Sequence, residues 1–202
     1  MNEIVNLLKK VKVLPLLTIK DMKDAKKIGE CLVEGGVPIV EVAFRSQQAA
    51  EGIKELNKIS NLIVGAGTVC NLKDAKSAVE NGAKFIVTPG LVEEVIVYAN
   101  ELNIPVFPGA VTPSEIIYAK NHNLKCVKFF PADNYGGIKT LKALHGPFGD
   151  ITFLPTGGID INNYKEYLEL DYVTAVGGSF VVPNKYVEAK DWEGLTKHIL
   201  SL

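Results

Sequence analysis

Short apolar runs recur along the chain, and each is followed by Gly, Pro or Thr and then by a segment with helical spacing. Eight such runs occur, at residues 11–17, 37–44, 62–65, 84–88, 104–107, 125–130, 151–155 and 172–176. Their starts lie about 20 to 26 residues apart, which is close to the minimum length of a strand and a crossover helix. The pattern predicts eight parallel strands, each followed by a helix.

The segments between the runs carry start and stop signals for helices. Asn71 and Thr112 are good N-caps, and Pro113 and Glu115 after Thr112 predict a capping box. A pair of glycines, Gly35 and Gly36, favours the end of a helix. The expected helices include residues 1–13 (a short amphipathic helix at the N-terminus), 21–36, 71–83, 91–103, 112–123 and 185–202.

Eight strand–helix units in 202 residues favour an α/β fold, a single (β/α)8 TIM barrel that spans residues 1–202 and begins with a short helix. The alternative is an open doubly wound sheet, which normally has five or six strands and a Gly-rich dinucleotide loop. The nearest candidate for that loop, Gly65-Ala66-Gly67, is followed by Thr-Val-Cys rather than by x-x-Gly. The barrel is therefore the favoured prediction.

The composition is that of an ordinary globular protein, with 47% hydrophobic and 22% charged residues. A net charge of -1 removes the electrostatic argument for binding nucleic acid or a membrane surface. Cys31, Cys70 and Cys126 are scattered, so we expect neither a disulfide scaffold nor a metal site. No apolar run is long enough to span a membrane, and the N-terminus lacks the apolar core of a signal peptide. We expect a cytoplasmic protein.

The basic residues are 21 Lys and a single Arg, Arg45. Codon bias toward Lys is one explanation of the ratio. The other is that position 45 requires a guanidinium, which grips a carboxylate with two parallel hydrogen bonds as Lys cannot. Arg45 follows the second run, and barrel active sites lie at the C-terminal ends of strands. Arg45 is therefore a candidate anion ligand, with a chance surface Arg as the alternative.

Lys128 lies between Val127 and Phe129 in an apolar run, where the charged form of its amine loses solvation. A neutral amine in an apolar pocket is the nucleophile that Schiff-base chemistry with a carbonyl requires. The alternative is a lysine that snorkels to water from a strand end. Lys84 is a useful comparison, because it lies in another apolar run but near the N-terminal end of its strand.

Glu41 is the only charged residue within an otherwise apolar stretch that precedes Arg45. A carboxylate buried there must be paired or functional. It predicts a structural ion pair with Lys or Arg, a general acid/base, or both. Thr68 follows the third run, and its hydroxyl is a candidate for binding the same anion as Arg45 or for relaying a proton. The alternative is that Thr68 caps a helix or a turn.

Glycines cluster after the last two runs, as Gly157-Gly158 and Gly178-Ser179. Barrels often bind phosphate at these loops, where glycine lets backbone N–H groups approach the anion. The alternative is ordinary turn chemistry. These loops favour a phosphorylated substrate.

Seven motifs stand in a characteristic order from about residue 40 to residue 183. They are Glu-Val-x-x-Arg, Val-Gly-Ala-Gly-Thr-Val, Thr-Pro-Gly, Pro-Gly-x-x-Thr-Pro-Ser-Glu, Val-Lys-Phe-Phe-Pro-Ala, Pro-Thr-Gly-Gly-Ile and Val-Gly-Gly-Ser. Together they resemble the KDPG/KHG aldolase family, the aldolases of 2-keto-3-deoxy-6-phosphogluconate and 4-hydroxy-2-oxoglutarate.

The resemblance implies a metal-independent, cofactor-free class I aldolase on a (β/α)8 barrel, working as a homotrimer. It implies that Lys128 is the Schiff-base lysine and that Glu41 is the general acid/base. The expected binding partner is a small-molecule 2-keto acid, and the predicted phosphate loops favour a phosphorylated one. The positions expected to bind substrate are Arg45, Thr68, Pro89, Gly157, Gly158, Gly178 and Ser179.

The predicted reaction releases pyruvate and glyceraldehyde 3-phosphate from 2-keto-3-deoxy-6-phosphogluconate, or pyruvate and glyoxylate from 4-hydroxy-2-oxoglutarate. An aldolase for the galactonate epimer is one alternative. A sugar-phosphate isomerase or epimerase, which would use the same glycine loops without Lys128, is another. The sequence departs from the common family pattern at Ala43-Phe44 and at Asp133-Asn134-Tyr135, and the second departure would affect selectivity for the distal part of the substrate.

Overall fold

The computed structural model describes residues 2–202, which alternate between strands and helices. Within these residues the strands are β1 (Val13–Leu17), β2 (Ile39–Ala43), β3 (Ile63–Gly67), β4 (Ile86–Val87), β5 (Val106–Phe107), β6 (Cys126–Phe129), β7 (Thr152–Pro155) and β8 (Val176–Gly178). The helices are α1 (Asn2–Val11), α2 (Met22–Glu34), α3 (Ala49–Leu56), α4 (Leu72–Glu80), α5 (Glu93–Glu101), α6 (Pro113–Asn121), α7 (Gly137–His145), α8 (Tyr164–Leu168), the short 3-10 helix η1 (Ser179–Val181), α9 (Asn184–Glu188) and α10 (Trp192–Leu200).

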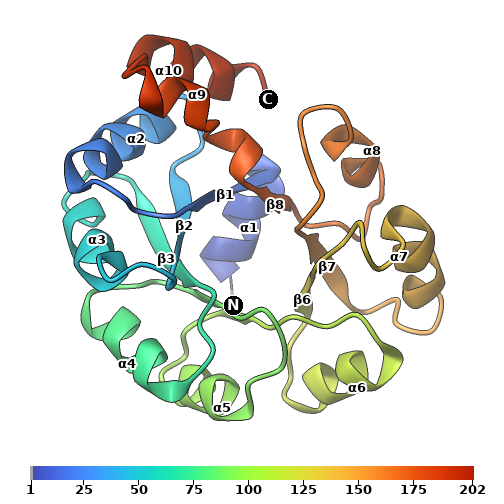
Figure 1. Ribbon diagram of the computed structural model, residues 1–202. Helices are drawn as coiled ribbons and strands as arrows, with labels where there is room; N and C mark the ends of the chain where they lie inside the picture. Colours follow the sequence, from blue (N-terminus) through green and yellow to red (C-terminus); the bar gives the residue numbers. More distant parts are fainter. Residues whose placement is uncertain (1) are drawn as a thin grey trace.

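The strands form a parallel ring with helices around it (Figure 1). Six strands pair in the order β5-β4-β3-β2-β1-β8, and β6 pairs with β7. Single backbone bridges join these two sheets, from Gly109 to Lys128 on one side and from Thr156 to Gly177 on the other. The ring is therefore closed, which confirms the predicted barrel and rules out the open doubly wound sheet.

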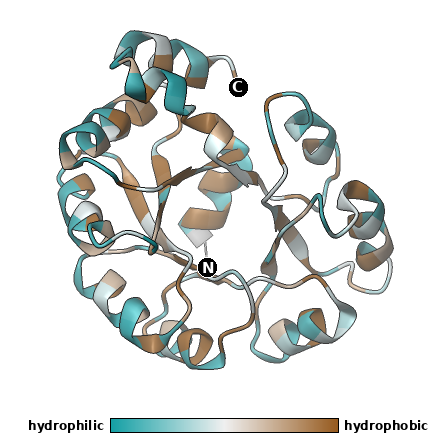
Figure 2. Ribbon diagram, in the orientation of Figure 1, coloured by the Kyte–Doolittle hydropathy of each residue, from teal (hydrophilic) through white to brown (hydrophobic). Residues whose placement is uncertain are grey.

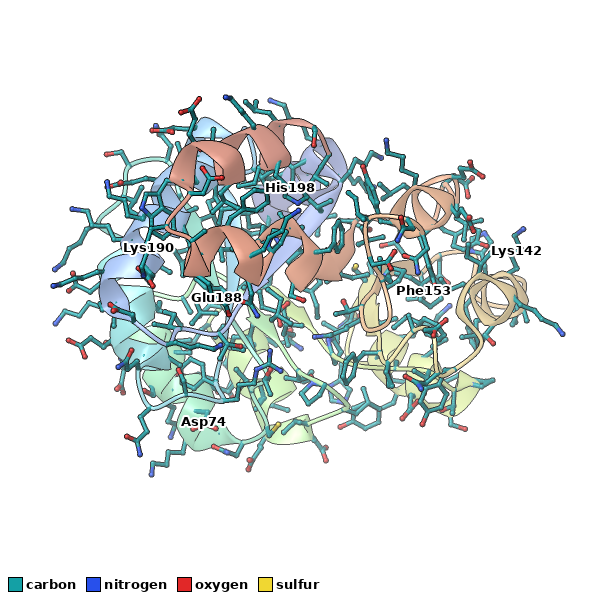
Figure 3. All side chains as sticks on the ribbon, turned by 45° about the horizontal axis from the view of Figure 1, so that its top comes forward. Asp74, Lys142, Phe153, Glu188, Lys190 and His198 are labelled. Atoms are coloured by element: carbon teal, nitrogen blue, oxygen red, sulfur yellow. The ribbon has the colours of Figure 1, made fainter. Side chains whose placement is uncertain are left out.

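The hydropathy pattern explains the layers of the barrel. Figure 2 shows the strands mostly apolar and the outer helices polar on the side away from the ring. In Figure 3, Lys142 of α7 extends outward from the molecule, whereas Phe153 of β7 is completely buried. This division is expected when amphipathic helices cover a sheet whose faces are both buried. No helix of the described residues has both the length and the apolar character needed to cross a bilayer.

Helix α1 lies across the centre of the ring in Figure 1, at the end where the strands begin. Its residues Val5 and Lys9 line a cavity of about 510 Å³ with the N-terminal ends of β5, β6 and β7. Leu8 of this helix is completely buried. The N-terminal helix therefore covers the base of the barrel and leaves the opposite end, the mouth, to the loops that follow the strands.

Local signals position most helices as predicted. Asn71 caps α4 by accepting a hydrogen bond from the backbone N–H of Asp74 at 2.9 Å. Thr112 and Glu115 form the expected capping box at the start of α6. Each such cap contributes about 1 kcal/mol to helix stability. The caps also set where each loop ends, and so which residues remain at the mouth.

Two elements differ most from the sequence prediction. The tail forms two helices because Lys190 adopts a left-handed conformation (φ 53°) and Asp191 caps a new helix, α10. Strand β8 covers Val176–Gly178, later than the apolar run at 172–176, because Gly177 and Gly178 pair with β1. Glycine has a low strand propensity, so the apolar pattern ends before the strand does.

Candidate active site

Lys128 and Glu41 meet inside the barrel. Their strands, β6 and β2, lie on opposite sides of the ring, so the two side chains can touch only if both point into its interior (Figure 1). Lys128 Nζ donates a hydrogen bond to Glu41 Oε1 at 3.5 Å. Lys128 is 4% exposed and Glu41 is 0% exposed. The amine of Lys128 therefore does not snorkel into bulk water, and the structural ion pair expected of Glu41 is present.

An aromatic ring also lies beside the amine of Lys128. Its Nζ lies 5.1 Å from the centre of the Phe130 ring, a cation–π distance. Removing an ammonium and a carboxylate from water costs several kcal/mol each, and their mutual attraction offsets part of that cost. By contrast Lys84, just before β4, is exposed. Of the two lysines compared, only Lys128 has the burial that a Schiff-base nucleophile requires.

Only one of the two carboxylate oxygens of Glu41 has a hydrogen-bond partner among the described residues. Oε2 is buried and has no hydrogen-bond partner among the described residues. Gly67 of β3 provides the space for this side chain, because a Cβ at that position would overlap with Glu41 Oε1 and Cγ. A buried carboxylate oxygen without a partner is costly. Such an oxygen can accept a proton from a water or a substrate hydroxyl that enters the barrel.

Thr68 follows Gly67 at the end of β3 in a left-handed conformation (φ 57°). This conformation is unfavourable for a β-branched residue, by about 1–3 kcal/mol. It ends β3 sharply and leaves Thr68 half-buried at the mouth. Strain of this kind is common at binding sites, where the surrounding structure holds a residue in place.

Arg45 lies in the turn after β2 and is exposed. Its Nε donates a hydrogen bond to Thr18 Oγ1 at 2.8 Å. Among the described residues no carboxylate forms an ion pair with it, since the cation in every ion pair there is a lysine. Arg45 and Ser179 line one cavity of about 550 Å³. Two expected ligands from strands β2 and β8 are thus brought together.

The other expected binding positions also lie at the mouth. Pro89 is half-buried, and its carbonyl packs so closely on Gly109 that a Cβ there would overlap with it. Gly157 and Gly158 adopt positive φ values of 90° and 77°, which favour glycine. A Cβ at Gly157 would lie 3.1 Å from the Phe130 ring. The first glycine of this loop thus packs beside the aromatic ring that faces Lys128.

Gly178 and Ser179 differ from that loop. Gly178 is buried and extended, and a Cβ there would lie 2.7 Å from the Phe180 ring, so glycine is required by packing rather than by conformation. Ser179 is exposed and begins η1. No three His, Cys, Asp or Glu side chains within the described residues gather closely enough to hold a metal ion.

Residues 4–198 match the profile of the family described as KDPG and KHG aldolase. The chain belongs to this family. A relative in Escherichia coli (strain K12), named KHG/KDPG aldolase, is 41% identical over 186 residues, which cover 92% of this chain and 87% of the relative. The family consists of lyases, so the chain is an enzyme of that class.

Solved structures of the family share the fold. The KDPG aldolase of Legionella pneumophila, which has pyruvate captured at low pH as a covalent carbinolamine, is 34% identical with a TM-score of 0.93, covering 98% of this chain and 96% of that one. The enzyme of Zymomonas mobilis ZM4 with 3-phosphoglycerate is 36% identical with a TM-score of 0.91, covering 98% and 95%. These likenesses support the barrel as the scaffold of the family's chemistry.

Sequence reasoning missed three residues that shape this candidate site. Gly67 is one of two glycines in a tight motif, and nothing in the pattern shows that a side chain from β2 occupies its space. Phe130 occurs in the sequence analysis only as the second Phe of the Val-Lys-Phe-Phe-Pro-Ala motif. Thr18 directly follows the first apolar run, at a strand end to which no site residue is assigned there. A hydroxyl at a strand end of a barrel is a signal that could have identified it.

Proposed function

We propose that the chain is a class I aldolase that cleaves 2-keto-3-deoxy-6-phosphogluconate to pyruvate and glyceraldehyde 3-phosphate, and also accepts 4-hydroxy-2-oxoglutarate. One observation carries the proposal. In a chain of this family, a lysine and a glutamate from opposite strands meet inside the barrel, with Nζ and Oε1 3.5 Å apart. An amine and an adjacent acid/base are the two groups that Schiff-base cleavage needs.

The first step is imine formation. Lys128 passes a proton to Glu41 and attacks the C2 ketone of the substrate with its neutral amine, giving a carbinolamine. Glu41 returns the proton to the departing hydroxyl, and loss of water leaves an iminium ion. At 3.5 Å, the proton can pass through one water molecule between Nζ and Oε1, or directly once the two atoms move slightly closer together.

Glu41, now a carboxylate again, next accepts the proton of the C4 hydroxyl. The C3–C4 bond breaks, its electron pair moves toward the positively charged imine nitrogen, and the aldehyde leaves. The resulting enamine is protonated at C3, and hydrolysis of the new iminium frees pyruvate and restores Lys128. The unpartnered Oε2 of Glu41 is the atom we assign to these exchanges.

The ends of the substrate are assigned from the arrangement of the mouth. Arg45 grips the C1 carboxylate, with Thr68 and Pro89 beside it, and so presents the ketone to Lys128. A phosphate at the distal end is bound by backbone N–H groups of the Gly157-Gly158 and Gly178-Ser179 loops. The left-handed glycines of the first loop support this assignment, because they let the backbone approach an anion.

Borohydride trapping with pyruvate tests the reaction class. A stable adduct on the chain is expected for the aldolase, and no adduct for an isomerase or epimerase. A coupled assay then compares kcat/KM for 2-keto-3-deoxy-6-phosphogluconate, its galactonate epimer and 4-hydroxy-2-oxoglutarate. A metal chelator is expected to leave cleavage unchanged, and sensitivity to chelation would contradict a class I mechanism.

The working form we propose is a homotrimer of one-domain chains in the cytoplasm. Family membership and the three free cysteines, Cys31, Cys70 and Cys126, support this proposal, since free thiols are typical of reducing compartments. Light scattering is expected to give three times the mass of the chain. A monomer or dimer at assay concentration would contradict the assembly without affecting the chemistry.

A further inference from the structure

Thr18 is the first residue after β1, at the mouth of the barrel. The register of β1 and β2 pairs Leu16 with Glu41 and Leu17 with Val42, so Thr18 falls next to the last residue of β2. Arg45 lies just beyond that residue. The parallel pairing therefore brings a hydroxyl from one strand end within reach of the guanidinium from the next.

Among the described residues, the guanidinium of Arg45 has one hydrogen-bond partner. Thr18 Oγ1 accepts a hydrogen bond from Nε at 2.8 Å. The backbone N–H of Arg45 donates to the carbonyl of Ala43 at 2.9 Å, which fixes the start of the side chain in a tight turn. A guanidinium has five N–H donors, one on Nε and two on each Nη. The contact with Thr18 therefore leaves the four donors on the two Nη atoms for a ligand.

We propose that Thr18 is a positioning residue that orients Arg45 for end-on binding of the substrate carboxylate. With Nε occupied, a carboxylate can form its two parallel hydrogen bonds only with the two Nη atoms. The hydrogen bond also orders a long side chain before substrate arrives, which lowers the entropy lost on binding. This inference rests on the proposed role of Arg45 and assigns that role a specific geometry.

Thr18→Val tests the proposal, because valine keeps the branched shape and removes the acceptor. The concentration of pyruvate that gives half-maximal borohydride trapping is expected to rise about three- to tenfold, the usual range for one lost hydrogen bond. The KM for substrate rises similarly, with kcat within about twofold of the original. Thr18→Ser, which restores the hydroxyl, recovers most of the affinity.

Two comparisons separate positioning from a general structural role. Trapping of pyruvamide, which has the same ketone but no carboxylate, is expected to be the same in Thr18→Val and in the unmodified protein. In an Arg45→Lys background, Thr18→Val is expected to have no further effect, because lysine has no Nε–H to orient. Equal melting temperatures of the variants show that the fold is intact.

Each contrary result has a separate meaning. Unchanged pyruvate trapping in Thr18→Val, with weakened trapping in Arg45→Lys, overturns the positioning role and leaves the proposed role of Arg45 standing. Equal losses for pyruvate and pyruvamide, or an undiminished effect of Thr18→Val in the Arg45→Lys background, also overturn it. If Arg45→Lys itself has no effect, the failure lies in the proposed carboxylate site, and the inference about Thr18 fails with it.

Discussion

Strand β6 carries two polar side chains that are two residues apart and lie in contrasting surroundings. Near the base of the barrel, Cys126 Sγ donates to Thr174 Oγ1 at 3.8 Å. Thr174 Oγ1 donates to Thr152 Oγ1 at 2.9 Å, and Thr152 Oγ1 donates to the carbonyl of Lys125 at 3.2 Å. Every donor in this chain of hydrogen bonds, the base network, has an acceptor within the protein.

Nearer the mouth, Lys128 meets Glu41, and the result is different. The carboxylate has one oxygen beside the amine and one with no partner among the described residues. Buried polar groups in proteins are nearly always satisfied, so exceptions indicate strain or function. The two clusters thus differ: every donor of the base network has an acceptor within the protein, whereas Lys128 and Glu41, the mouth pair, leave one buried carboxylate oxygen without a partner among the described residues.

Lys128→Ala should have the largest effect, because Lys128 is the only buried lysine among the described residues and the amine assigned to the imine. We expect no borohydride-trapped pyruvate adduct and no measurable cleavage. The matched control is Lys84→Ala, which removes an exposed lysine near the opposite end of a strand. Mass spectrometry after trapping measures both. An adduct that survives Lys128→Ala would mean that the nucleophile is elsewhere.

Glu41→Gln should reduce kcat about 10²- to 10⁴-fold, the usual contribution of a general acid/base. The amide keeps the size of the side chain but cannot take up and return the proton. Because Lys128 remains, slow trapping of pyruvate should persist, which separates this variant from Lys128→Ala. Single-turnover kinetics with substrate measure the loss. A kcat within tenfold of the original would show that another group moves the proton.

Gly67→Ala is expected to reduce kcat about 10- to 100-fold. The added Cβ would overlap with Glu41 and displace its carboxylate, and a misplacement of about 1 Å can cost that much. Gly146→Ala is the control, because the nearest atom to a Cβ there is the Ala143 carbonyl oxygen at an ordinary 3.5 Å. If both variants keep full activity, the position of Glu41 is less critical than the mouth pair indicates.

The barrel and the two buried charges at its mouth are predictable from the sequence. Alternating apolar runs and helical segments predict the barrel, because each strand–helix unit has local signals such as the caps at Asn71 and Thr112. Lys128 and Glu41 stand out because each is a lone charge in an apolar strand, and an uncompensated charge there is costly. These features are local in the chain.

The remaining features depend on contacts between distant segments. Glu41 and Lys128 are 87 residues apart, and only closure of the ring brings them together. The space at Gly67 and the partner of Arg45 depend on strand register, which short apolar runs do not specify. The apolar run at 172–176 ends before β8 does for another reason, because the last two residues of β8 are glycines, which have a low strand propensity. At the mouth, strand register is what the sequence leaves open.

Thr174→Val tests the base network. Thr174 is 1% exposed, and losing its hydroxyl leaves the Cys126 thiol without an acceptor and the Thr152 hydroxyl without a donor. We expect the free energy of unfolding to fall by about 1–3 kcal/mol, with kcat and KM within about twofold of the original. Urea unfolding and the coupled assay measure the two effects. A large loss of activity at unchanged stability would place this network in the catalytic machinery and remove the contrast.

The smallest effect concerns pH. Burial raises the pKa of the Cys126 thiol, so above the ordinary thiol range the unfolded chain loses this proton before the folded protein does. Stability should therefore be unaffected near neutral pH and fall as the pH rises, by at most about 1.4 kcal/mol per pH unit for this group. Burial raises the pKa of Cys31 in the same direction, so the total decline includes both thiols.

The contribution of Cys126 to this loss of stability at high pH is measured by comparing variants. Cys126→Ala should lower stability at every pH, because it leaves a small cavity, but its stability should decline less steeply between pH 8 and about 10.5 than that of the unmodified protein. Cys70→Ala is the matched control, since it removes an exposed thiol. Urea unfolding at each pH gives the slopes. Equal slopes for Cys126→Ala and the unmodified protein would show that water reaches the Cys126 thiol, and the base network would then not be satisfied by the protein alone.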